Sequence, residues 1–136
     1  MRRKIIAAVL GATALAGVTA APAVADATAA ARYGGQCGSG YSVVNSFDLP
    51  SGRGSVFLTY NAGNRKNCVV TVRTTSGTAT LVEAFLRKSS DAGWAIDSGN
   101  YTAYAGPVHV SAPGACVDWG GTIGTATDAR YGTNCG

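Results

Sequence analysis

The chain is poor in the side chains that most enzymes use for catalysis. It has 136 residues, of which one is histidine (His109) and one is glutamate (Glu83), and only 13% are charged. A Ser-His-Asp or Cys-His relay would depend on His109 alone. His109 lies between two valines, so on a strand with both valines facing the core it would face solvent or the other side of the sheet. The scarcity of these residues argues against a hydrolase.

Known catalytic motifs are also missing. The sequence contains no GxSxG elbow, HExxH helix, Walker loop or dinucleotide fingerprint. A glycosidase needs two opposed carboxylates, and Asp91 and Asp97 lie in sequence that is typical of turns. Among the acidic residues, Asp118, in CVDWGG, is a stronger candidate for a functional role than Asp91 or Asp97. An aspartate beside a buried tryptophan, however, usually accepts hydrogen bonds for structural reasons. We therefore expect no enzyme activity and no cofactor, with a hydrolase as the least favoured alternative.

The four cysteines include no CxxC pair. A zinc site would also require His109 to stand at ligand-like spacing from a cysteine, which it does not. An even number of cysteines in a small exported domain indicates two disulfides instead, and four cysteines allow three pairings. We expect no metal site.

Long apolar runs are absent beyond the first residues. Arg2, Arg3 and Lys4, the apolar stretch 5–18 and the small residues Ala23-Val24-Ala25 follow the order of a secretory signal peptide, which we assign to residues 1–25. The stretch is shorter than the roughly 20 residues that span a membrane. We expect a secreted protein with no membrane insertion after cleavage, which follows Ala25 or a residue slightly later.

Removal of the signal peptide also removes most of the excess positive charge. Three of the eleven basic residues lie within residues 1–25 and none of the seven acidic residues does, which leaves eight minus seven, or a net charge of +1. The remaining basic pairs, Arg65-Lys66 and Arg87-Lys88, look like solvated surface positions. This balance argues against a nucleic-acid partner, which would require a clustered basic face.

The exported part predicts an all-β domain, an antiparallel sandwich or barrel held by disulfides. Short apolar runs alternate with turn signals about every ten residues. Residues 26–32 are predicted to be a mobile N-terminal segment and 33–136 a single β-domain. The expected strands are 41–45, 56–60, 68–73, 94–97, 108–111, 116–119 and 125–130, with a hairpin between the second and third and a turn at 97–100.

Residues 80–88 (TLVEAFLRK) are compatible with a helix or a strand. Thr80 and Glu83 could form a helical capping box. Val82, Ala84 and Leu86, however, alternate with their neighbours, and the surrounding segments are strands, so the sequence predicts a strand here.

Aromatic residues cluster in the second half of the chain, where Trp94, Tyr101, Tyr104 and Trp119 lie among small polar residues. Exposed aromatic rings with polar neighbours suit flat or extended ligands such as glycans. We take these four residues and Asp118 as candidate ligand-binding residues. Because so small a domain needs large core residues, we expect Trp119 to be buried, and Trp94 or one tyrosine to be exposed.

Several longer segments carry a family resemblance. They are CGSGYSVVNS (37–46), VFLTYN with NCVVTVR (56–73), DSGNYTAYAGPVHVSAPGACVDWGG (97–121) and the closing Asn-Cys-Gly. Together they are similar to the spore-associated protein A family of filamentous actinomycetes. The resemblance implies export and retention on or near the spore or aerial-cell surface. We take a cell-wall or spore-envelope component as the candidate partner. It implies no reaction, cofactor or catalytic residue.

Three functions therefore compete. The first is a non-enzymatic structural or interaction domain at the spore or cell surface. The second is a glycan- or peptidoglycan-binding module that uses Trp94, Tyr101 and Tyr104. The third is an inhibitor of extracellular proteases that presents Arg65 or Lys66 on an extended loop. The sequence leaves the oligomeric state open.

Two similar octapeptides bound the predicted domain: ARYGGQCG at 31–38 and ARYGTNCG at 129–136 share six of eight positions. Nothing between them is duplicated, so they do not indicate an internal repeat. Their glycines would let the backbone pass close to a sheet, where a disulfide could hold it. This favours the bridges Cys37–Cys68 and Cys116–Cys135, with Cys37–Cys135 as the main rival.

Overall fold

The computed structural model describes Gly17 and residues 30–136. The predicted signal peptide, Gly17 aside, and residues 26–29 lie outside the described residues. The described chain forms eight strands and one short 3-10 helix. Their bounds are β1 Ser42–Asp48, η1 Pro50–Gly52, β2 Gly54–Asn61, β3 Lys66–Arg73, β4 Thr80–Lys88, β5 Ala95–Tyr101, β6 Tyr104–Ser111, β7 Val117–Ile123 and β8 Ala126–Thr133.

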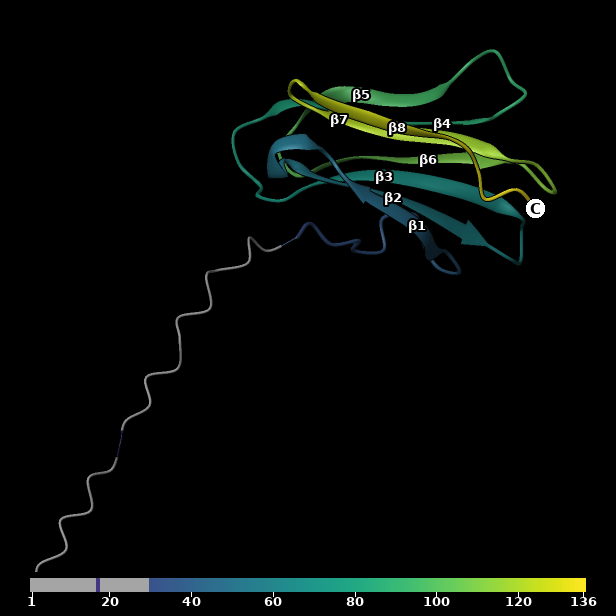
Figure 1. Cartoon of the computed structure of the whole chain (residues 1–136), viewed down its shortest axis with the longest axis horizontal. Helices are drawn as coiled ribbons and strands as arrows, with labels where there is room; N and C mark the ends of the chain where they lie inside the picture. The colour runs from purple at the N-terminus through teal and green to yellow at the C-terminus, as the bar shows by residue number, and fades with distance from the viewer. Residues whose placement is uncertain (1–16, 18–29) are drawn as a thin grey trace, which may run out of the picture.

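The strands form two antiparallel sheets that pack face to face (Figure 1). The first sheet has the order β1-β2-β3-β6 and the second the order β5-β4-β7-β8. The chain changes sheet between β3 and β4, between β5 and β6, and between β6 and β7. The sheets do not close into a barrel, so the all-β prediction is confirmed in its sandwich form.

Side chains that point alternately toward and away from the core explain why β2 and β3 form the two strands of the hairpin. On β2, Val56 and Leu58 are fully buried between the sheets, and β3 pairs with β2 so that Val69 lies opposite Leu58 on the same face. The hairpin predicted between these segments is confirmed. β3 contains four consecutive β-branched residues, 69–72, and such residues pack well on a pleated surface.

The ambiguous segment 80–88 is a strand. Val82, Ala84 and Leu86 are fully buried, whereas Leu81 is 38% exposed. Glu83 does not cap a helix, because its carboxylate accepts a hydrogen bond from Ser98 on the neighbouring β5 at 2.7 Å. An alternating pattern therefore prevails over residues that individually favour a helix.

The turn predicted at 97–100 is wrong. These residues lie within β5 and pair with β4, and the chain turns instead at Thr102 and Ala103. Asp97, which suggested a turn, accepts hydrogen bonds from the Tyr101 hydroxyl and the Gly106 backbone N–H. Tertiary partners thus replace the local hydrogen bonds that make aspartate a turn former.

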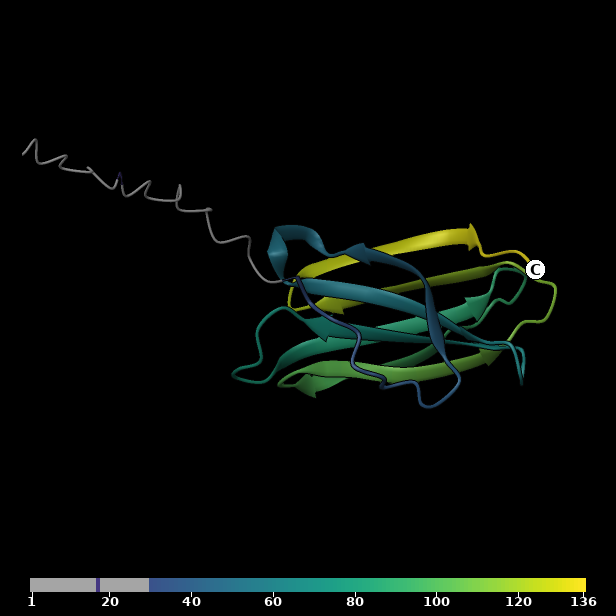
Figure 2. The same cartoon turned by 90° about the horizontal axis from the view of Figure 1, so that it is seen from below.

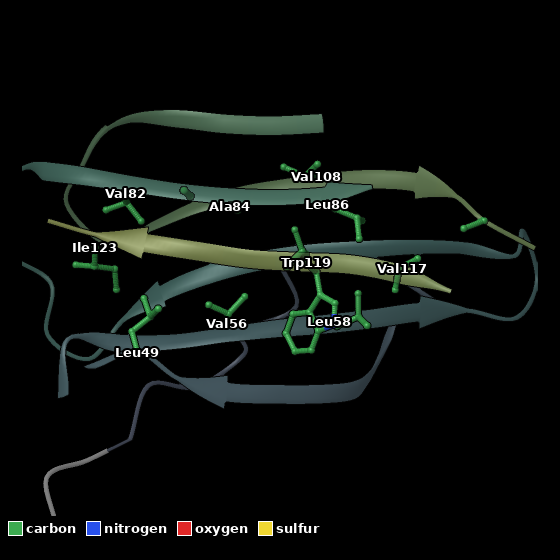
Figure 3. Packing of buried hydrophobic residues seen from close by; sticks show 13 residues of the cluster. Leu49, Val56, Leu58, Val82, Ala84, Leu86, Val108, Val117, Trp119 and Ile123 are labelled. Atoms are coloured by element: carbon green, nitrogen blue, oxygen red, sulfur yellow. The ribbon is translucent and has the colours of Figure 1, made fainter. Parts of the chain in front are cut away.

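The core lies between the two sheets and contains Trp119 at its centre (Figure 3). Trp119 is fully buried, as expected, and its ring packs 5.0 Å from that of Phe47, centroid to centroid. Its indole Nε1 donates a hydrogen bond to Thr133 Oγ1 on β8 at 2.8 Å. Two residues further along β7, a Cβ on Gly121 would overlap Thr71 Oγ1 from the opposite sheet, so the glycine permits the sheets to approach closely here.

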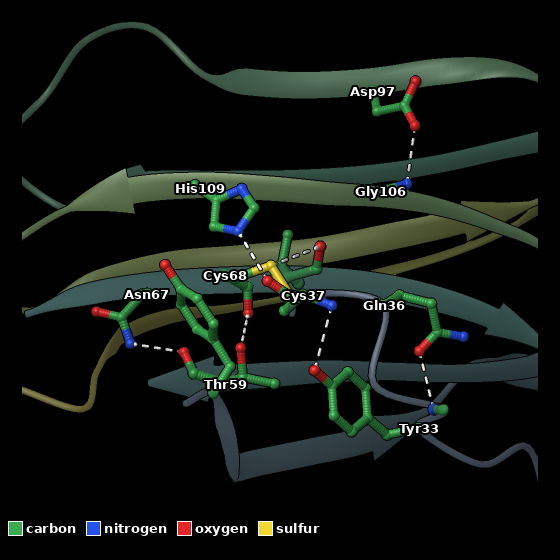
Figure 4. Close-up of a disulfide and its surroundings, with 12 residues drawn as sticks. Tyr33, Gln36, Cys37, Thr59, Asn67, Cys68, Asp97, Gly106 and His109 are labelled. Atoms are coloured by element: carbon green, nitrogen blue, oxygen red, sulfur yellow. Dashed lines mark hydrogen bonds between the residues drawn. A yellow bond between two sulfur atoms is a disulfide. The ribbon is translucent and has the colours of Figure 1, made fainter. Parts of the chain in front are cut away.

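The first octapeptide crosses the outer face of the first sheet (Figures 2 and 4). A disulfide joins Cys37 to Cys68 on β3, and both residues are buried. The Tyr33 ring packs on Phe57 at a centroid distance of 6.1 Å, and its hydroxyl accepts a hydrogen bond from the Cys37 N–H. His109 on β6 lies with Nε2 3.2 Å from the Cys37 carbonyl oxygen.

The second octapeptide includes the end of β8 and the C-terminus. A disulfide joins Cys135 to Cys116, the residue before β7, and Cys135 is exposed. The Asn45 side-chain amide donates to Asn134 Oδ1 at 3.1 Å, which ties this end to β1. Both bridges are the pairs favoured from the sequence, and each holds one end of the domain to a nearby strand.

Candidate binding surface

The candidate ligand-binding residues do not form one site. Trp119 belongs to the core. Trp94 directly precedes β5, whereas Tyr101 ends β5 and Tyr104 begins β6. Asp118 is buried beneath the outer face of the second sheet. The five candidates therefore divide among the core, the β5–β6 turn and the outer face.

The β5–β6 turn has a shallow hollow of about 360 Å³ lined by Tyr101, Tyr104 and Asp97. The Tyr101 hydroxyl donates to Asp97 Oδ1 at 2.6 Å, and this hydrogen bond is the main cause that raises the pKa of the Tyr101 phenol. The Asp97 carboxylate is also occupied by the Gly106 N–H. These hydrogen bonds fix the conformation of the β5–β6 turn. Tyr104, at 41% exposed, is the accessible aromatic ring of the hollow.

An aromatic cluster lies on the outer face of the second sheet. The rings of Phe85 and Trp94 are 5.1 Å apart, and those of Trp94 and Tyr131 are 6.4 Å apart, both in edge-to-face geometry. Ile96 pairs across the strands with Phe85 and is 54% exposed, while Tyr131 is 65% exposed. We call these four residues the aromatic face.

Gly120 lies directly beneath the Phe85 ring of this cluster. It pairs with Phe85 across β4 and β7, and a Cβ at this position would lie 2.5 Å from Cε2 of the Phe85 ring. The ring therefore lies directly on the glycine backbone. The first glycine of the GG pair in CVDWGG thus has a packing role on the outer face, whereas Gly121 faces the core.

Arg87 and Asp118 form an ion pair that supports the aromatic face at Trp94. The Arg87 guanidinium lies 4.2 Å from the centroid of the Trp94 ring, a cation–π contact. Its Nε donates to Asp118 Oδ2 at 2.9 Å. Asp118 Oδ1 accepts two further bonds, from the Ser89 hydroxyl at 2.6 Å and the Gly132 N–H at 2.8 Å. The prediction that Arg87 is a solvated surface position is wrong, because its side chain is only 22% exposed and is ion-paired.

The local β-bulge explains how Asp118 reaches three donors. The pairing of β7 with β8 shifts by one residue between Val117 and Trp119, and Gly132, opposite, has a φ of 62° that a residue with a Cβ rarely adopts. Burial alone would raise the pKa of Asp118, but its hydrogen bonds and the positive charge of Arg87 outweigh that effect and lower it. Asp118 is thus a structural anchor beneath Trp94.

Loss of the Asp118 charge is expected to destabilise the fold. Asp118→Asn should lower the free energy of unfolding at pH 7 by about 2–4 kcal/mol, because Arg87 is left without its carboxylate partner. The pKa of Asp118 is lower in the folded than in the unfolded chain, so its contribution is complete above the unfolded value of about 3.9 and disappears as pH falls through the folded value. Urea unfolding at pH 7 and pH 3 measures both effects.

Asp128→Asn is the matched control for this experiment. Asp128 also has a lowered pKa, chiefly because Arg130 donates a hydrogen bond to it, but both side chains are more than two-fifths exposed. An exposed pair contributes less than about 1 kcal/mol. Equal effects of the two substitutions, or a pH-independent effect of Asp118→Asn, would contradict the role assigned to Asp118.

Sequence reasoning missed Phe85, Arg87, Ile96 and Tyr131 as members of this surface. Two signals were present. The alternation in 80–88 that predicts a strand also places Phe85 and Arg87 together on the face opposite the buried residues. Tyr131 lies in the second octapeptide, where it matches Tyr33 of the first, and each tyrosine packs on an aromatic ring of the outer face of a different sheet.

His109, on which a hydrolase would depend, and Arg65, which a protease inhibitor would present, both make contacts within the fold. His109 is exposed on the outer face of the first sheet, next to a backbone carbonyl, and its ring packs edge-on against Tyr41. Arg65 lies in the β2–β3 turn with a φ of 59°, and its N–H donates to the Asn61 carbonyl. At Arg65 this tight turn lacks the extended backbone that the protease-inhibitor hypothesis requires, whereas Lys66 begins β3 and is exposed.

Comparison with known proteins supplies the family. Spore-associated protein A from Streptomyces coelicolor is 52% identical to this chain over 118 residues, a match that covers 85% of this chain and 76% of that protein. The chain belongs to the spore-associated protein A family. The resemblance drawn from the sequence is thereby confirmed. No protein-family model matches the chain, and no solved structure matches it.

Membership of the spore-associated protein A family assigns no residue a role. Within residues 30–136 and Gly17, no helix is long and apolar enough to cross a membrane. The same described residues contain no group of three or more histidine, cysteine or acidic side chains placed to hold a metal ion.

Proposed function

We propose that this protein is an exported, non-enzymatic β-sandwich that attaches to the surface of the spore or cell that produces it. The observation that carries the proposal is the 52% identity to a spore-associated protein. The order of residues 2–25 supports export, because it follows that of a secretory signal. Two disulfides fit an oxidising, extracellular location.

The arrangement of titratable side chains supports an interaction role over a catalytic one. Asp118 is saturated by three hydrogen-bond donors, Asp97 by two, and Glu83 accepts from Ser98. Carboxylates engaged by internal donors in this way contribute to the stability of the fold.

Cell fractionation tests the proposal. Immunoblots of washed spores, vegetative cells and culture fluid should show the protein predominantly on washed spores or cells, in a form that begins at residue 26 or shortly after it. A variant that lacks residues 2–25 serves as the control and should remain inside the cell. Protein found only free in the culture fluid, or a full-length precursor inside wild-type cells, would contradict the proposal.

A further inference from the structure

We propose that the aromatic face binds an uncharged glycan strand of the cell wall, whose sugar rings pack with their C–H faces against Tyr131, Trp94 and Phe85. This inference rests on the proposed function, because it names the partner through which the protein would be retained at the surface. Its first support is exposure: Tyr131 is 65% and Ile96 54% exposed, next to two further aromatic rings. Neighbouring exposed apolar side chains of this kind mark interaction sites.

The charges of this face favour an uncharged ligand. Three ionisable side chains of β4 and β7 belong to it: Glu83, Arg87 and Asp118. Arg87 is paired with Asp118, and Glu83 accepts the hydrogen bond of Ser98, so the one basic side chain of β4 and β7 on this face is neutralised, while Lys88 ends β4 on the alternate side of the strand. Phosphate-rich polymers and anionic lipid surfaces need clustered lysine or arginine. An uncharged polysaccharide strand can bind without clustered lysine or arginine.

Polar side chains lie on the same outer face of the second sheet as the aromatic rings. Ser98 and Asn100 on β5 and Thr127 on β8 are exposed, and they alternate with inward-facing residues, so they lie on the same outer face as Ile96. The Ser98 hydroxyl donates to Glu83 and the Thr127 hydroxyl to the Gly121 carbonyl, so each would meet a sugar hydroxyl through its remaining acceptor lone pair. Apolar surface beside a few polar groups is the usual composition of a small-ligand site.

The small extent of the aromatic face argues against a second protein chain as the occupant. It comprises Phe85, Trp94, Ile96 and Tyr131, of which only Ile96 and Tyr131 are largely exposed. A stable protein interface buries about 20–30 residues on each side. One or two sugar rings can cover a surface of this size, whereas a partner subunit would have to extend well beyond it.

The aromatic rings are held in place before any ligand arrives. Trp94 contacts Phe85 on one side, Tyr131 on another and the Arg87 guanidinium at 4.2 Å, and Asp118 fixes the guanidinium. A pre-organised surface loses little side-chain entropy on binding. Arg87 and Asp118 are therefore positioning residues for Trp94.

Co-sedimentation with insoluble polysaccharide tests the inference. The mature chain, residues 26–136, is mixed with isolated peptidoglycan or with chitin, which has acetylated amino-sugar rings but no stem peptides. Wild-type protein should sediment with both, and the bound fraction should change little when salt is raised, because the proposed glycan ligand carries no charge. Tyr131→Ala and Trp94→Ala should each weaken binding by about tenfold or more, since each removes a stacking ring.

Tyr104→Ala is the matched control, because Tyr104 is an exposed tyrosine on β6 of the other sheet. It should bind like the wild type, and circular dichroism should show all three variants folded. Equal binding by all variants, binding to peptidoglycan alone, or binding that salt abolishes would overturn the inference. So would a dimer in sedimentation equilibrium that Tyr131→Ala dissociates, without glycan binding.

The two proposals fail in distinguishable ways. Protein that is present on washed spores but does not sediment with either polysaccharide retains the proposed function and loses the glycan inference. Protein that sediments with both polysaccharides through Tyr131, yet is found only in the culture fluid, retains the glycan site and loses surface attachment.

Discussion

Trp119→Ala is expected to lower the free energy of unfolding by about 3–5 kcal/mol, a large part of the stability of a domain of this size. Trp119 is fully buried between the sheets, next to Phe47 and opposite Leu86 on β4 (Figure 3). Alanine would leave a cavity that neither sheet can close, because both are held by their hydrogen-bonded ladders. Urea unfolding followed by circular dichroism measures the loss.

Two variants separate the volume of Trp119 from its hydrogen bond. Trp119→Phe retains most of the apolar volume and removes the indole N–H, whereas Thr133→Val removes only the acceptor of the 2.8 Å bond. Each should cost less than the alanine substitution, with Thr133→Val at about 1–3 kcal/mol because a buried N–H is left unpaired. A loss below about 1 kcal/mol for Trp119→Ala would show that this ring is not the centre of the core.

Removal of the Cys37–Cys68 bridge is expected to cost about 4 kcal/mol. The bridge closes a loop with a sequence separation of 31, and the entropy gained by the unfolded chain grows with loop length. The double substitution of Cys37 and Cys68 by alanine should also release the first octapeptide from β2 and β3 and expose Val70, which is fully buried beside the bridge. Unfolding in urea and limited proteolysis near residue 33 measure the two effects.

The Cys116–Cys135 bridge provides the matched comparison. Its sequence separation is 19, so its removal is expected to cost about 3 kcal/mol. Because Cys135 is exposed, a mild thiol reductant should open this bridge before the buried one, as alkylation and mass spectrometry would show. Preferential reduction of Cys37–Cys68, or resistance of the first octapeptide to protease without its bridge, would contradict the assigned roles.

The strands were largely predictable because burial imposes a period of two. Val82, Ala84 and Leu86 all face the core, and this pattern decided the conformation of 80–88 despite two leucines, a glutamate and an alanine that favour helices. The strand conformation of 97–100 was not predictable, because Asp97 finds its hydrogen-bond partners in Tyr101 and Gly106, of which the second lies on the other sheet.

The candidate binding residues were only partly predictable. Trp94 and Asp118 do lie on one face, but the contact between them passes through Arg87, which its sequence neighbours identify only as a charged residue. Tyr101 and Trp119 are near Trp94 in the sequence, yet one closes a turn and the other fills the core. Closeness along the chain does not decide which face of a sheet a ring occupies.

By itself, the sequence determined the all-β class, the family, the disulfide count and the burial of Trp119, since each depends on local alternation, on composition or on motifs. Only the tertiary structure decided which rings share a surface and what the two octapeptides contact. Each octapeptide places its tyrosine against an aromatic ring on the outer face of a sheet and its cysteine in a disulfide. Such pairings depend on strand order and register, which are settled by contacts between residues far apart in the chain.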